Sequence, residues 1–357
     1  MVLFMGMNVA NTDSSYSQKN RETTKAVDTF LLKNYSDNKE ILRHIKHRQE
    51  TSPTKIKSFF IRLGYEIGGG KDWNEIIPLC AMCELLNIGN YLIEQGIDEV
   101  DGSKAKLGHL IRKLVLESKF LTRDERGIFK KMIEGINEYL EIDNKVLLWR
   151  DKIDAKNFFR LYKKKCFLVG GQFYGHCLEL GFLRSGSVKK DVKKHLIQIG
   201  QIFGTYYQMM HEVADLLPES LKRFPEDFKY YQKQYNSFRK RKLTLPIYFA
   251  LYEWKDFNKE LFFELFENDK YEEITEMFLK AKIIKKCKTY IRKSMGKDLA
   301  SGESPWNAID GIWVDSLKYA VNAVNSNRFW QLFRQLYHSS HPEFISGSQR
   351  DAETSSA

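Results

Sequence analysis

Apolar residues along the chain recur mostly at intervals of three and four, and strict alternation of apolar and polar positions is scarce. The first pattern is typical of helices that bury one face, whereas the second is typical of strands. The sequence therefore predicts an all-α fold. Each predicted stretch is one helix or a helix pair, and the stretches are 26–36, 55–67, 75–98, 104–119, 124–148, 155–182, 188–217, 225–240, 244–267, 270–295 and 306–337.

Glycine, proline and short polar runs separate these stretches, as at Gly68–Gly70 and Asp101–Ser103. Between residues 26 and 339 the helices follow one another without a linker, and no repeat of fixed period is visible. We therefore expect one large helical domain over 26–339, with central helices that are apolar on nearly all faces. The polar ends, 1–25 and 340–357, are predicted to be disordered tails.

Composition narrows the class of protein. Hydrophobic residues make up 43% of the 357 residues, which is typical of a globular protein and too high for a disordered one. No apolar run approaches the roughly 18 residues that cross a bilayer, so no transmembrane span is expected. The first residues lack the features of a signal peptide, and the five scattered cysteines show no disulfide framework. These features predict a cytoplasmic location.

A polar stripe runs along the otherwise apolar helix predicted at 75–98. The polar residues that recur at spacings of three or four, and so share one face, are Asn87, Asn90, Glu94, Asp98 and Asp101. Carboxylates on a buried helix are unfavourable unless positive charge pairs with them. A salt bridge to a neighbouring helix or a solvated helix end would explain the stripe, and a bound cation is the alternative.

A second polar stripe lies in the helix predicted at 188–217. Gln208, His211, Glu212 and Asp215 cluster on one side, among aromatic and methionine side chains. A capped helix end is the simplest interpretation. The alternative is that the two stripes face each other across a helical bundle, where their carboxylates would hold Mg²⁺ and the metal would hold a diphosphate.

Four segments match motifs that occur together, in this order, in one family of helical enzymes. Glu84–Asp98 matches E-L-I-H-x-x-S-L-h-h-D-D-x-x-D without a gap, with E-Q-G-I-D as its acidic part. Gly204–Asp215 matches the frame G-x-x-F-Q-x-x-D-D-x-x-D, with H-E-V-A-D as its acidic part. Lys242–Leu251 fits K-x-T-L-P-x-x-x-A-L at every fixed position, and Phe60–Leu63 resembles an h-R-P helix. The chain thus resembles the trans-isoprenyl diphosphate synthases, or polyprenyl synthetases.

This resemblance implies a helical bundle of the isoprenoid synthase type with a central cavity, in which an allylic prenyl diphosphate is ionised with the help of Mg²⁺. The catalytic, metal-binding positions that it assigns are Glu94, Asp98, Glu212 and Asp215. Four carboxylates thus remain of the six in an intact pair of motifs. Because a neutral His211 is a poor Mg²⁺ ligand, one or two ions are expected rather than a cluster of three.

The resemblance also assigns contacts with the substrate. Lys165 stands at the position of a lysine that holds the diphosphate, although Lys164 fits an alternative register. Gly89 and Asn90 are expected to form the floor of the prenyl pocket. The complete set of predicted substrate-binding residues is Arg62, Gly89, Asn90, Gln95, Lys165, Gln208, His211 and Lys242.

The second substrate of the family, isopentenyl diphosphate, is poorly supported. Phe59 stands where its lysine belongs, and no arginine pair follows Asp98. We therefore expect prenyl transfer to another acceptor, a peptide or a small molecule, or cyclisation to a terpene. The Lys165-Cys166 step and the segment 242–252 resemble most closely the enzymes that prenylate a tryptophan of bacterial competence pheromones.

Two other functions are considered, and the first of them stays open. The chain is alternatively a non-catalytic regulatory subunit of a heteromeric prenyl diphosphate synthase, and a homodimer or such a heterodimer is expected. The net charge of +11 raises the question of nucleic acid, but the basic clusters are spread along the chain and alternate with acidic residues. We therefore expect no nucleic-acid partner. The excess charge would serve a diphosphate, and part of it would allow peripheral contact with anionic membranes.

Overall fold

The computed structural model describes residues 9–51, 55–148, 154–214 and 241–300. Within these residues all regular structure is helical, and two segments meet only in an isolated bridge between Leu148 and Lys242. The all-α prediction is therefore confirmed. The predicted stretches 225–240 and 306–337 and the expected tail at 340–357 lie outside the described residues.

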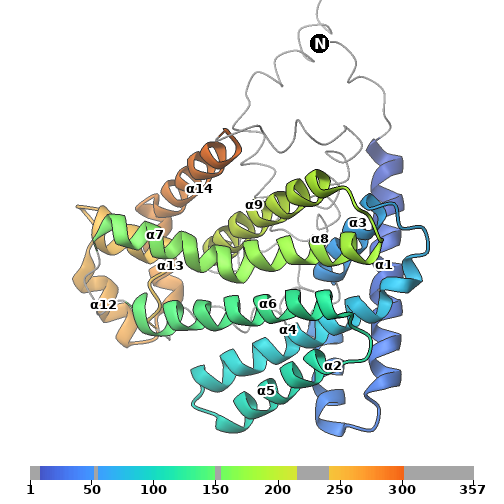
Figure 1. The fold of residues 1–357 in the computed structure, drawn as a ribbon. Coiled ribbons are helices and arrows are strands. Elements are labelled where there is room, and N and C mark those ends of the chain that lie inside the picture. Colours follow the sequence, from blue (N-terminus) through green and yellow to red (C-terminus); the bar gives the residue numbers. More distant parts are fainter. Residues whose placement is uncertain (1–8, 52–54, 149–153, 215–240, 301–357) are drawn as a thin grey trace, which may run out of the picture.

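The helices follow one another with short connections (Figure 1). The α-helices are α1 (Val9–Asn34), α2 (Lys39–Thr51), α3 (Ile56–Ile67), α4 (Ile77–Asp98), α5 (Gly102–Leu116), α6 (Arg123–Glu141), α7 (Ala155–Cys166), α8 (Gln172–Arg184), α9 (Lys190–Ala214), α11 (Leu245–Tyr248), α12 (Lys259–Glu267), α13 (Tyr271–Lys280) and α14 (Ile283–Ala300). A 3₁₀ turn, η1 (Trp73–Ile76), precedes α4, and the π-helical turns are η2 (Ile142–Val146), η3 (Phe167–Gly171) and η7 (Phe249–Glu253).

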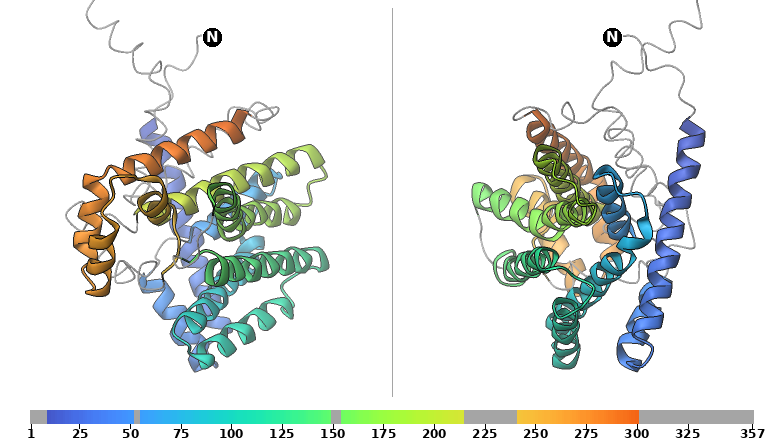
Figure 2. Two further views of the ribbon diagram at one scale, coloured as in Figure 1. Left: turned by 90° about the vertical axis from the view of Figure 1, so that its left-hand side faces the viewer. Right: turned by 45° about the vertical axis from the view of Figure 1, so that its right-hand side comes forward.

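The closest helix pairs are α4 with α5, α3 with α8, and α8 with α9. The long helix α1 runs along one side of this bundle, where it packs against α3 and α4 (Figure 2). The segment from α12 to α14 lies at one end of the bundle, and α14 leads back to α9. The elements that carry the two polar stripes, α4 and α9, therefore belong to the same bundle.

The segment Trp73–Ile97 is long and apolar enough to cross a membrane by composition alone. In the structure, however, 72% of its most apolar window is buried inside the protein. The helices that pack most extensively against it are α5, α1 and α3, and α2 and α6 also contact it. The core of the bundle thus accounts for the apolar character of this segment.

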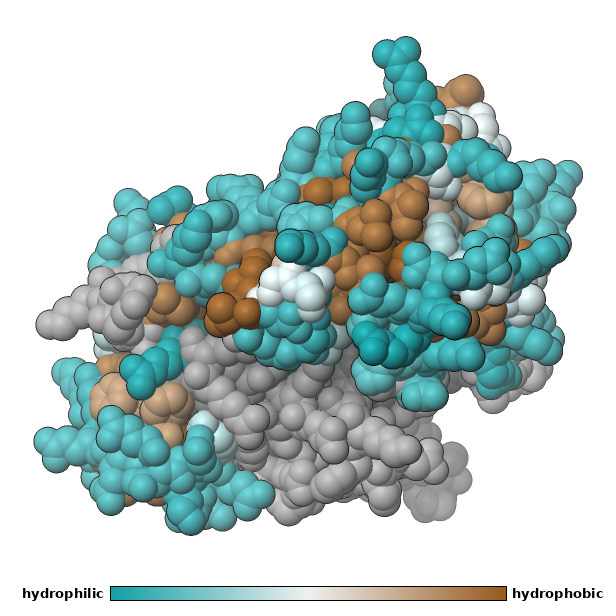
Figure 3. All heavy atoms as spheres, turned by 90° about the horizontal axis from the view of Figure 1, so that it is seen from below, coloured by the Kyte–Doolittle hydropathy of each residue, from teal (hydrophilic) through white to brown (hydrophobic). Residues whose placement is uncertain are grey.

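Apolar side chains also reach the surface. On the face seen from below, a band of hydrophobic atoms is bordered by hydrophilic ones (Figure 3). Large apolar side chains that are exposed in the described part include Val100, Leu110 and Phe263. A contiguous apolar patch on a protein surface is typical of an interaction site.

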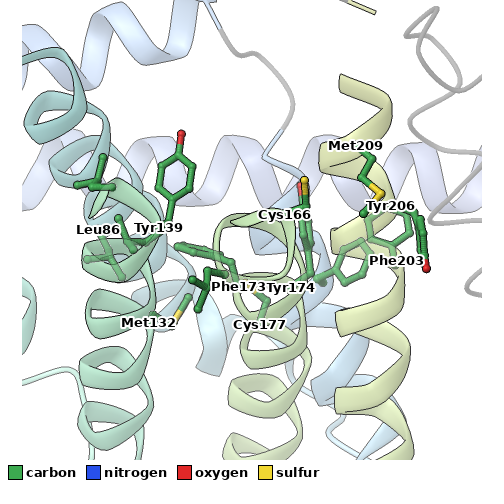
Figure 4. Packing of buried hydrophobic residues seen from close by; sticks show 14 of the residues in the cluster. Leu86, Met132, Tyr139, Cys166, Phe173, Tyr174, Cys177, Phe203, Tyr206 and Met209 are labelled. Carbon is green, nitrogen blue, oxygen red and sulfur yellow. The ribbon is translucent and has the colours of Figure 1, made fainter. Parts of the chain in front are cut away.

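An aromatic cluster fills the space between α3, α8 and α9. The Phe60 ring lies 4.9 Å from the rings of both Tyr174 and Phe203, and the last two rings are 5.3 Å apart. Figure 4 shows Tyr174 on α8 next to Phe203 on α9, with Tyr206 beyond it on the same helix. Aromatic pairs at these separations stabilise a core beyond the area that they bury. This cluster fixes α9, and with it the second polar stripe, against α8.

The N-terminal helix corrects one expectation. Because α1 begins at Val9, the prediction of a disordered tail was wrong over residues 9–25. The sequence there is polar, but Asn20 and Thr23 are buried, and Thr23 accepts a hydrogen bond of 2.9 Å from Arg62 on α3. Polar contacts of this kind have no hydropathy signal. The helix α2, which buries Ile41 and Ile45, was also not predicted.

Two of the predicted stretches form helix pairs in the structure, which the prediction of one helix or a helix pair allowed. The stretch 244–267 is interrupted because Asn258 caps the start of α12, where its side chain accepts a hydrogen bond from the backbone of Leu261. The stretch 270–295 is interrupted at Lys282, whose φ of 55° ends the helical path between α13 and α14. By contrast, α7, η3 and α8 form an unbroken succession, as the pattern at 155–182 predicted.

A close contact between η3 and α9 depends on two glycines. A Cβ atom at Gly204 would lie 2.3 Å from the carbonyl oxygen of Gly170, and a Cβ atom at Gly170 would lie 2.1 Å from that of Gly204. These distances lie far below van der Waals contact, and the neighbours are backbone atoms. The second polar stripe therefore reaches its depth in the bundle because neither position carries a side chain.

We predict that Gly204→Ala lowers the free energy of unfolding by about 1–3 kcal/mol, because the added methyl group forces η3 and α9 apart. Gly127→Ala on α6 is the matched control, since its Cβ atom would meet no atom within 4 Å. That change is expected to stabilise the protein by about 0.5–1 kcal/mol. Denaturant unfolding of both variants checks this, and equal effects of the two changes would contradict it.

A second prediction concerns Glu179, which links α8 to α9. Its carboxylate accepts hydrogen bonds of 2.9 Å from His176 and from Lys193. Burial alone would raise the pKa of Glu179, but these two partners lower it from 4.5 to about 2. A lowered carboxyl pKa adds stability above the unfolded pKa, and this stability is lost as the pH falls toward the folded value.

We therefore expect Glu179→Gln to lower the free energy of unfolding by about 2 kcal/mol at pH 7. The difference from the wild type is expected to shrink between pH 4.5 and pH 2, the window that the shift defines. Unfolding curves over this pH range measure the effect. Glu141→Gln, which removes an exposed partner of Lys145, is the control. A constant difference across the range would contradict the prediction.

Candidate active site

Four buried charged groups form the centre of the site. Lys165 on α7 lies 3.1 Å from an oxygen of Asp143 and 2.7 Å from an oxygen of Glu212 on α9. Lys242 pairs with the other oxygen of Asp143. All four side chains are at most 8% exposed. Two cations and two anions thus balance each other inside the bundle.

Local structure explains how these groups meet. The π-helical turn η2 follows α6 and carries Asp143. Shortly after η2, the backbone of Leu147 accepts a hydrogen bond of 2.8 Å from Leu243, and the isolated bridge joins Leu148 to Lys242. This pairing brings the segment before α11 alongside the end of η2. A lysine that is 99 residues away from Asp143 in the sequence thereby becomes its partner.

The pairing keeps the charges ionised. Burial alone would raise the pKa of Asp143, but Lys165 and Lys242 outweigh burial and hold it below its ordinary value. Burial alone would lower the pKa of Lys165, but Glu212 and Asp143 outweigh burial and raise it. Buried ions in proteins are normally paired in this way, because each one loses its hydration and gains from an opposite charge.

Tyr139 connects this centre to the first polar stripe. Its hydroxyl donates a hydrogen bond of 3.0 Å to Glu94 on α4, and it lies one helical turn before Asp143. Burial raises the pKa of Tyr139 most, and the negative charges of Asp143, Glu94 and Glu212 raise it further. Glu94, from the first stripe, therefore contacts this phenol directly, and the charge of Glu212, from the second stripe, acts on it.

Three predicted substrate-binding residues of α4 contact neighbouring side chains or helices. Asn90 accepts a hydrogen bond of 2.8 Å from Arg112 on α5. Gln95 donates one of 2.8 Å to Tyr91 on its own helix. Gly89 faces α5, because a Cβ atom there would lie 3.0 Å from the carbonyl oxygen of Gly108. The structure thus places Gly89 in the contact between α4 and α5.

Arg62 lies in a different setting from the one that the resemblance implies. Its guanidinium donates hydrogen bonds of 2.9 Å to Thr23 and to Glu66, and it stacks 4.4 Å above the ring of Trp73. Arg62 therefore ties α1 to α3, and the structure does not join it to the four buried charges. Phe59, beside it on α3, is 3% exposed and belongs to the core.

Gln208 and His211 are half-buried on α9, and the ring of His211 lies 6.4 Å from that of Tyr207. Asp98 is the last residue of α4, and Asp215 lies outside the described residues. Among the described residues, no group of three or more acidic, histidine or cysteine side chains is arranged to hold a metal ion. The expectation of a complete carboxylate set thus stays a prediction.

Three residues of this region were missed by sequence reasoning. Tyr139 and Asp143 lie four apart on the predicted helix 124–148, where a carboxylate on an apolar helix was the available signal. Lys57 on α3 donates a hydrogen bond to Asn87 and lies 4.3 Å from the ring centre of Phe173. No motif covers Lys57, and only the tertiary fold brings it to the first stripe.

The chain was compared with known proteins and structures. No protein-family model and no curated protein sequence matches it. Its structure is similar to that of a decaprenyl diphosphate synthase from Rhodobacter capsulatus, with a TM-score of 0.62 and 15% identity over 88% of this chain and 99% of that chain. It is also similar to a geranylgeranyl pyrophosphate synthase from Lactobacillus brevis ATCC 367 complexed with citrate, with a TM-score of 0.61 and 15% identity over 90% and 95%.

A further similar structure is a polyprenyl synthase from Caulobacter crescentus CB15, complexed with calcium and isoprenyl diphosphate. The TM-score is 0.61 and the identity 13%, over 89% of this chain and 94% of that chain. Identities this low show a shared fold and leave the activity to be argued from the site. The protein has the fold of the trans-isoprenyl diphosphate synthases.

Proposed function

We propose that the protein processes an allylic prenyl diphosphate, with Lys165 and Lys242 as the residues that bind its diphosphate. One observation carries this proposal: two buried lysines from distant segments converge on Asp143, between the two polar stripes of an isoprenyl synthase fold. An ammonium group is a strong phosphate binder as a point charge. Two of them at one place suit a group with several negative charges.

Binding a diphosphate there requires an exchange of partners. Lys165 and Lys242 already have counter-ions, so the ligand must replace the contacts that Asp143 and Glu212 make. Such an exchange is feasible because the lysines face negative charge in both states: that of Asp143 and Glu212 before binding, and that of the diphosphate afterwards. A buried lysine that lost its partner without a replacement would be strongly destabilising.

The carboxylates near this centre are suitable ligands for a hard cation such as Mg²⁺. Glu94 and Glu212 supply carboxylate oxygens, which Mg²⁺ prefers, and no donor in the described residues makes a good hydrogen bond to Oε2 of Glu212. Asp98 and Asp215 would complete the set for one or two ions. When bound, Mg²⁺ would neutralise charge that develops on the departing diphosphate.

The reaction that we propose breaks the bond between the allylic carbon and the diphosphate oxygen, and the electron pair leaves with the diphosphate. Aromatic faces stabilise the allylic cation that remains. Tyr206, which is fully buried, and Tyr207 on α9, together with Tyr91 on α4, are the aromatic residues that we assign to this task. The cation then reacts with an acceptor or cyclises.

The acceptor that we propose is not isopentenyl diphosphate. Phe59 is an apolar core residue at the position of the expected lysine, and Arg62 is occupied by Thr23, Glu66 and Trp73. The two positions of α3 from which the resemblance expects contacts with a second diphosphate therefore do not offer a cation for it. The acceptor that we propose is a peptide, a small molecule or the prenyl chain itself. The proposed location of the protein is the cytoplasm.

A second candidate function is that of a non-catalytic subunit in a heteromeric prenyl diphosphate synthase. The observation that favours it is the complete internal pairing of the charged centre, because Glu212 already binds Lys165. The apolar band on one face (Figure 3) would suit contact with another subunit. Diphosphate release by the purified protein distinguishes the two functions.

We predict that the purified protein with Mg²⁺ releases diphosphate from at least one allylic diphosphate of 10 to 20 carbons. Glu94→Gln and Glu212→Gln are expected to lower the rate by about a hundredfold or more, because each removes a charged oxygen donor. Glu138→Gln, which breaks an exposed pair with Lys164, is the control and should leave the rate unchanged. Volatile, lipid and peptide products identify the acceptor.

If no substrate of this panel yields diphosphate, the enzymatic function is contradicted and the subunit function gains support. Equal losses in the control and in the two variants would contradict a specific role of Glu94 and Glu212 in the reaction.

We also predict that Asp143→Asn lowers the free energy of unfolding by about 3 kcal/mol, because two buried lysines then face the single carboxylate of Glu212. Inorganic diphosphate is expected to restore part of this stability, and to raise the melting temperature of the variant more than that of the wild type. Thermal unfolding with and without diphosphate measures both. Equal shifts in the two proteins would contradict diphosphate binding by Lys165 and Lys242.

A further inference from the structure

A second buried polar cluster lies where α4, α5 and α6 meet. Arg112 on α5 is 4% exposed, and its guanidinium donates two hydrogen bonds. One, of 2.8 Å, runs from Nε to the amide oxygen of Asn90 on α4, and the other, of 2.6 Å, runs from Nη1 to the amide oxygen of Asn137 on α6. A single cation therefore holds three helices together through uncharged partners.

This arginine differs from the buried lysines in its electrostatics. Within the described residues, no carboxylate lies within 4.0 Å of its guanidinium. Burial lowers the pKa of Arg112 to about 10, and no charged neighbour is found to oppose that shift. Buried charges in proteins are normally paired. The charge of Arg112 is thus buried without a counter-ion in the described part of the chain.

The same cluster contains hydrogen-bond donors that lack acceptors. Nη2 of Arg112 and Nδ2 of Asn90 are both buried, and neither has a hydrogen-bond partner. Each of these nitrogens carries two hydrogens. Asn90 is 8% exposed, so its amide is as enclosed as the guanidinium. The unused groups at this junction are therefore all donors, and they surround a positive charge.

Packing of the three helices does not account for this arrangement. The two bonds that Arg112 makes to Asn90 and Asn137 would tie the helices equally well if every donor were satisfied. Buried donors without acceptors are unfavourable, and so is an unpaired buried charge. A group that brings negative charge and acceptor oxygens would remove both penalties at once.

We propose that Arg112 and Asn90 form a binding site for a carboxylate group. One carboxylate oxygen would accept hydrogen bonds from Nη2 of Arg112, and the other would accept from Nδ2 of Asn90. A carboxylate suits the site better than a phosphate because it carries a single negative charge, like the single cation here. Its two oxygens also match planar N–H donors.

Access to the site is expected from the side of α6. Asn137, which binds Nη1 of Arg112, is exposed, so the guanidinium lies directly beneath the surface there. The site uses neither Lys165 nor Lys242, so the proposal can be tested independently of diphosphate binding. It places a carboxylate-bearing ligand one helical turn from Glu94 along α4.

Thermal unfolding of the full chain tests the proposal, with sodium acetate as the probe and sodium chloride at the same ionic strength as the reference. Acetate at about ten times its Kd is expected to raise the melting temperature of the wild type by about 2 °C over chloride. Arg112→Gln should abolish this difference. Arg160→Gln, which changes an exposed arginine on α7, should retain it.

A second variant keeps the test decisive if Arg112→Gln does not fold. Asn90→Asp supplies a carboxylate within the chain, beside Nε of Arg112. This variant should melt at a higher temperature than the wild type in chloride and should no longer respond to acetate. An equal response of the wild type to acetate and chloride, or an acetate response that survives in Asn90→Asp, would overturn the proposal.

Discussion

The charged centre depends on one carboxylate, Asp143, which accepts Lys165 on one oxygen and Lys242 on the other. Without it, two ammonium groups would be buried opposite Glu212 alone. The positive and negative charges of this centre have to balance. This requirement constrains the surrounding elements, because each lysine must reach the same carboxylate from a different part of the chain. The π-helical turn η2, the end of α7 and the segment before α11 meet that requirement together.

The same constraint explains why the second polar stripe is held so firmly. Glu212 reaches Lys165 only because α9 approaches η3 closely, and that approach depends on Gly170 and Gly204 having no side chains. The aromatic cluster around Tyr174 packs against α9 beside this contact, because a Cβ atom at Gly204 would also lie 2.7 Å from the Tyr174 ring. Backbone contact, aromatic packing and ion pairing therefore act on one helix, and a change in any of them would move Glu212 relative to Asp143.

The motifs predicted the fold and several members of the centre, because Lys165, Glu212 and Lys242 each stand in a recognisable sequence frame. Asp143 was not predicted, since its importance arises from a partner 99 residues away and from a π-helical turn that no hydrophobic period reveals. The helix over residues 9–25 was missed for a related reason. Its burial involves polar contacts such as that of Thr23 with Arg62, which hydropathy does not register.

Neutrality also limits how the centre would accept a ligand. If a diphosphate displaced Asp143 from the two lysines, the carboxylate would remain buried and would then need a proton or a cation of its own. The centre would therefore bind an anion together with a cation more favourably than it would bind the anion alone, because the cation would neutralise the displaced carboxylate of Asp143. Coupling of this kind suits a substrate that binds as its magnesium complex, and it follows from the pairing of Asp143 rather than from the acidic motifs.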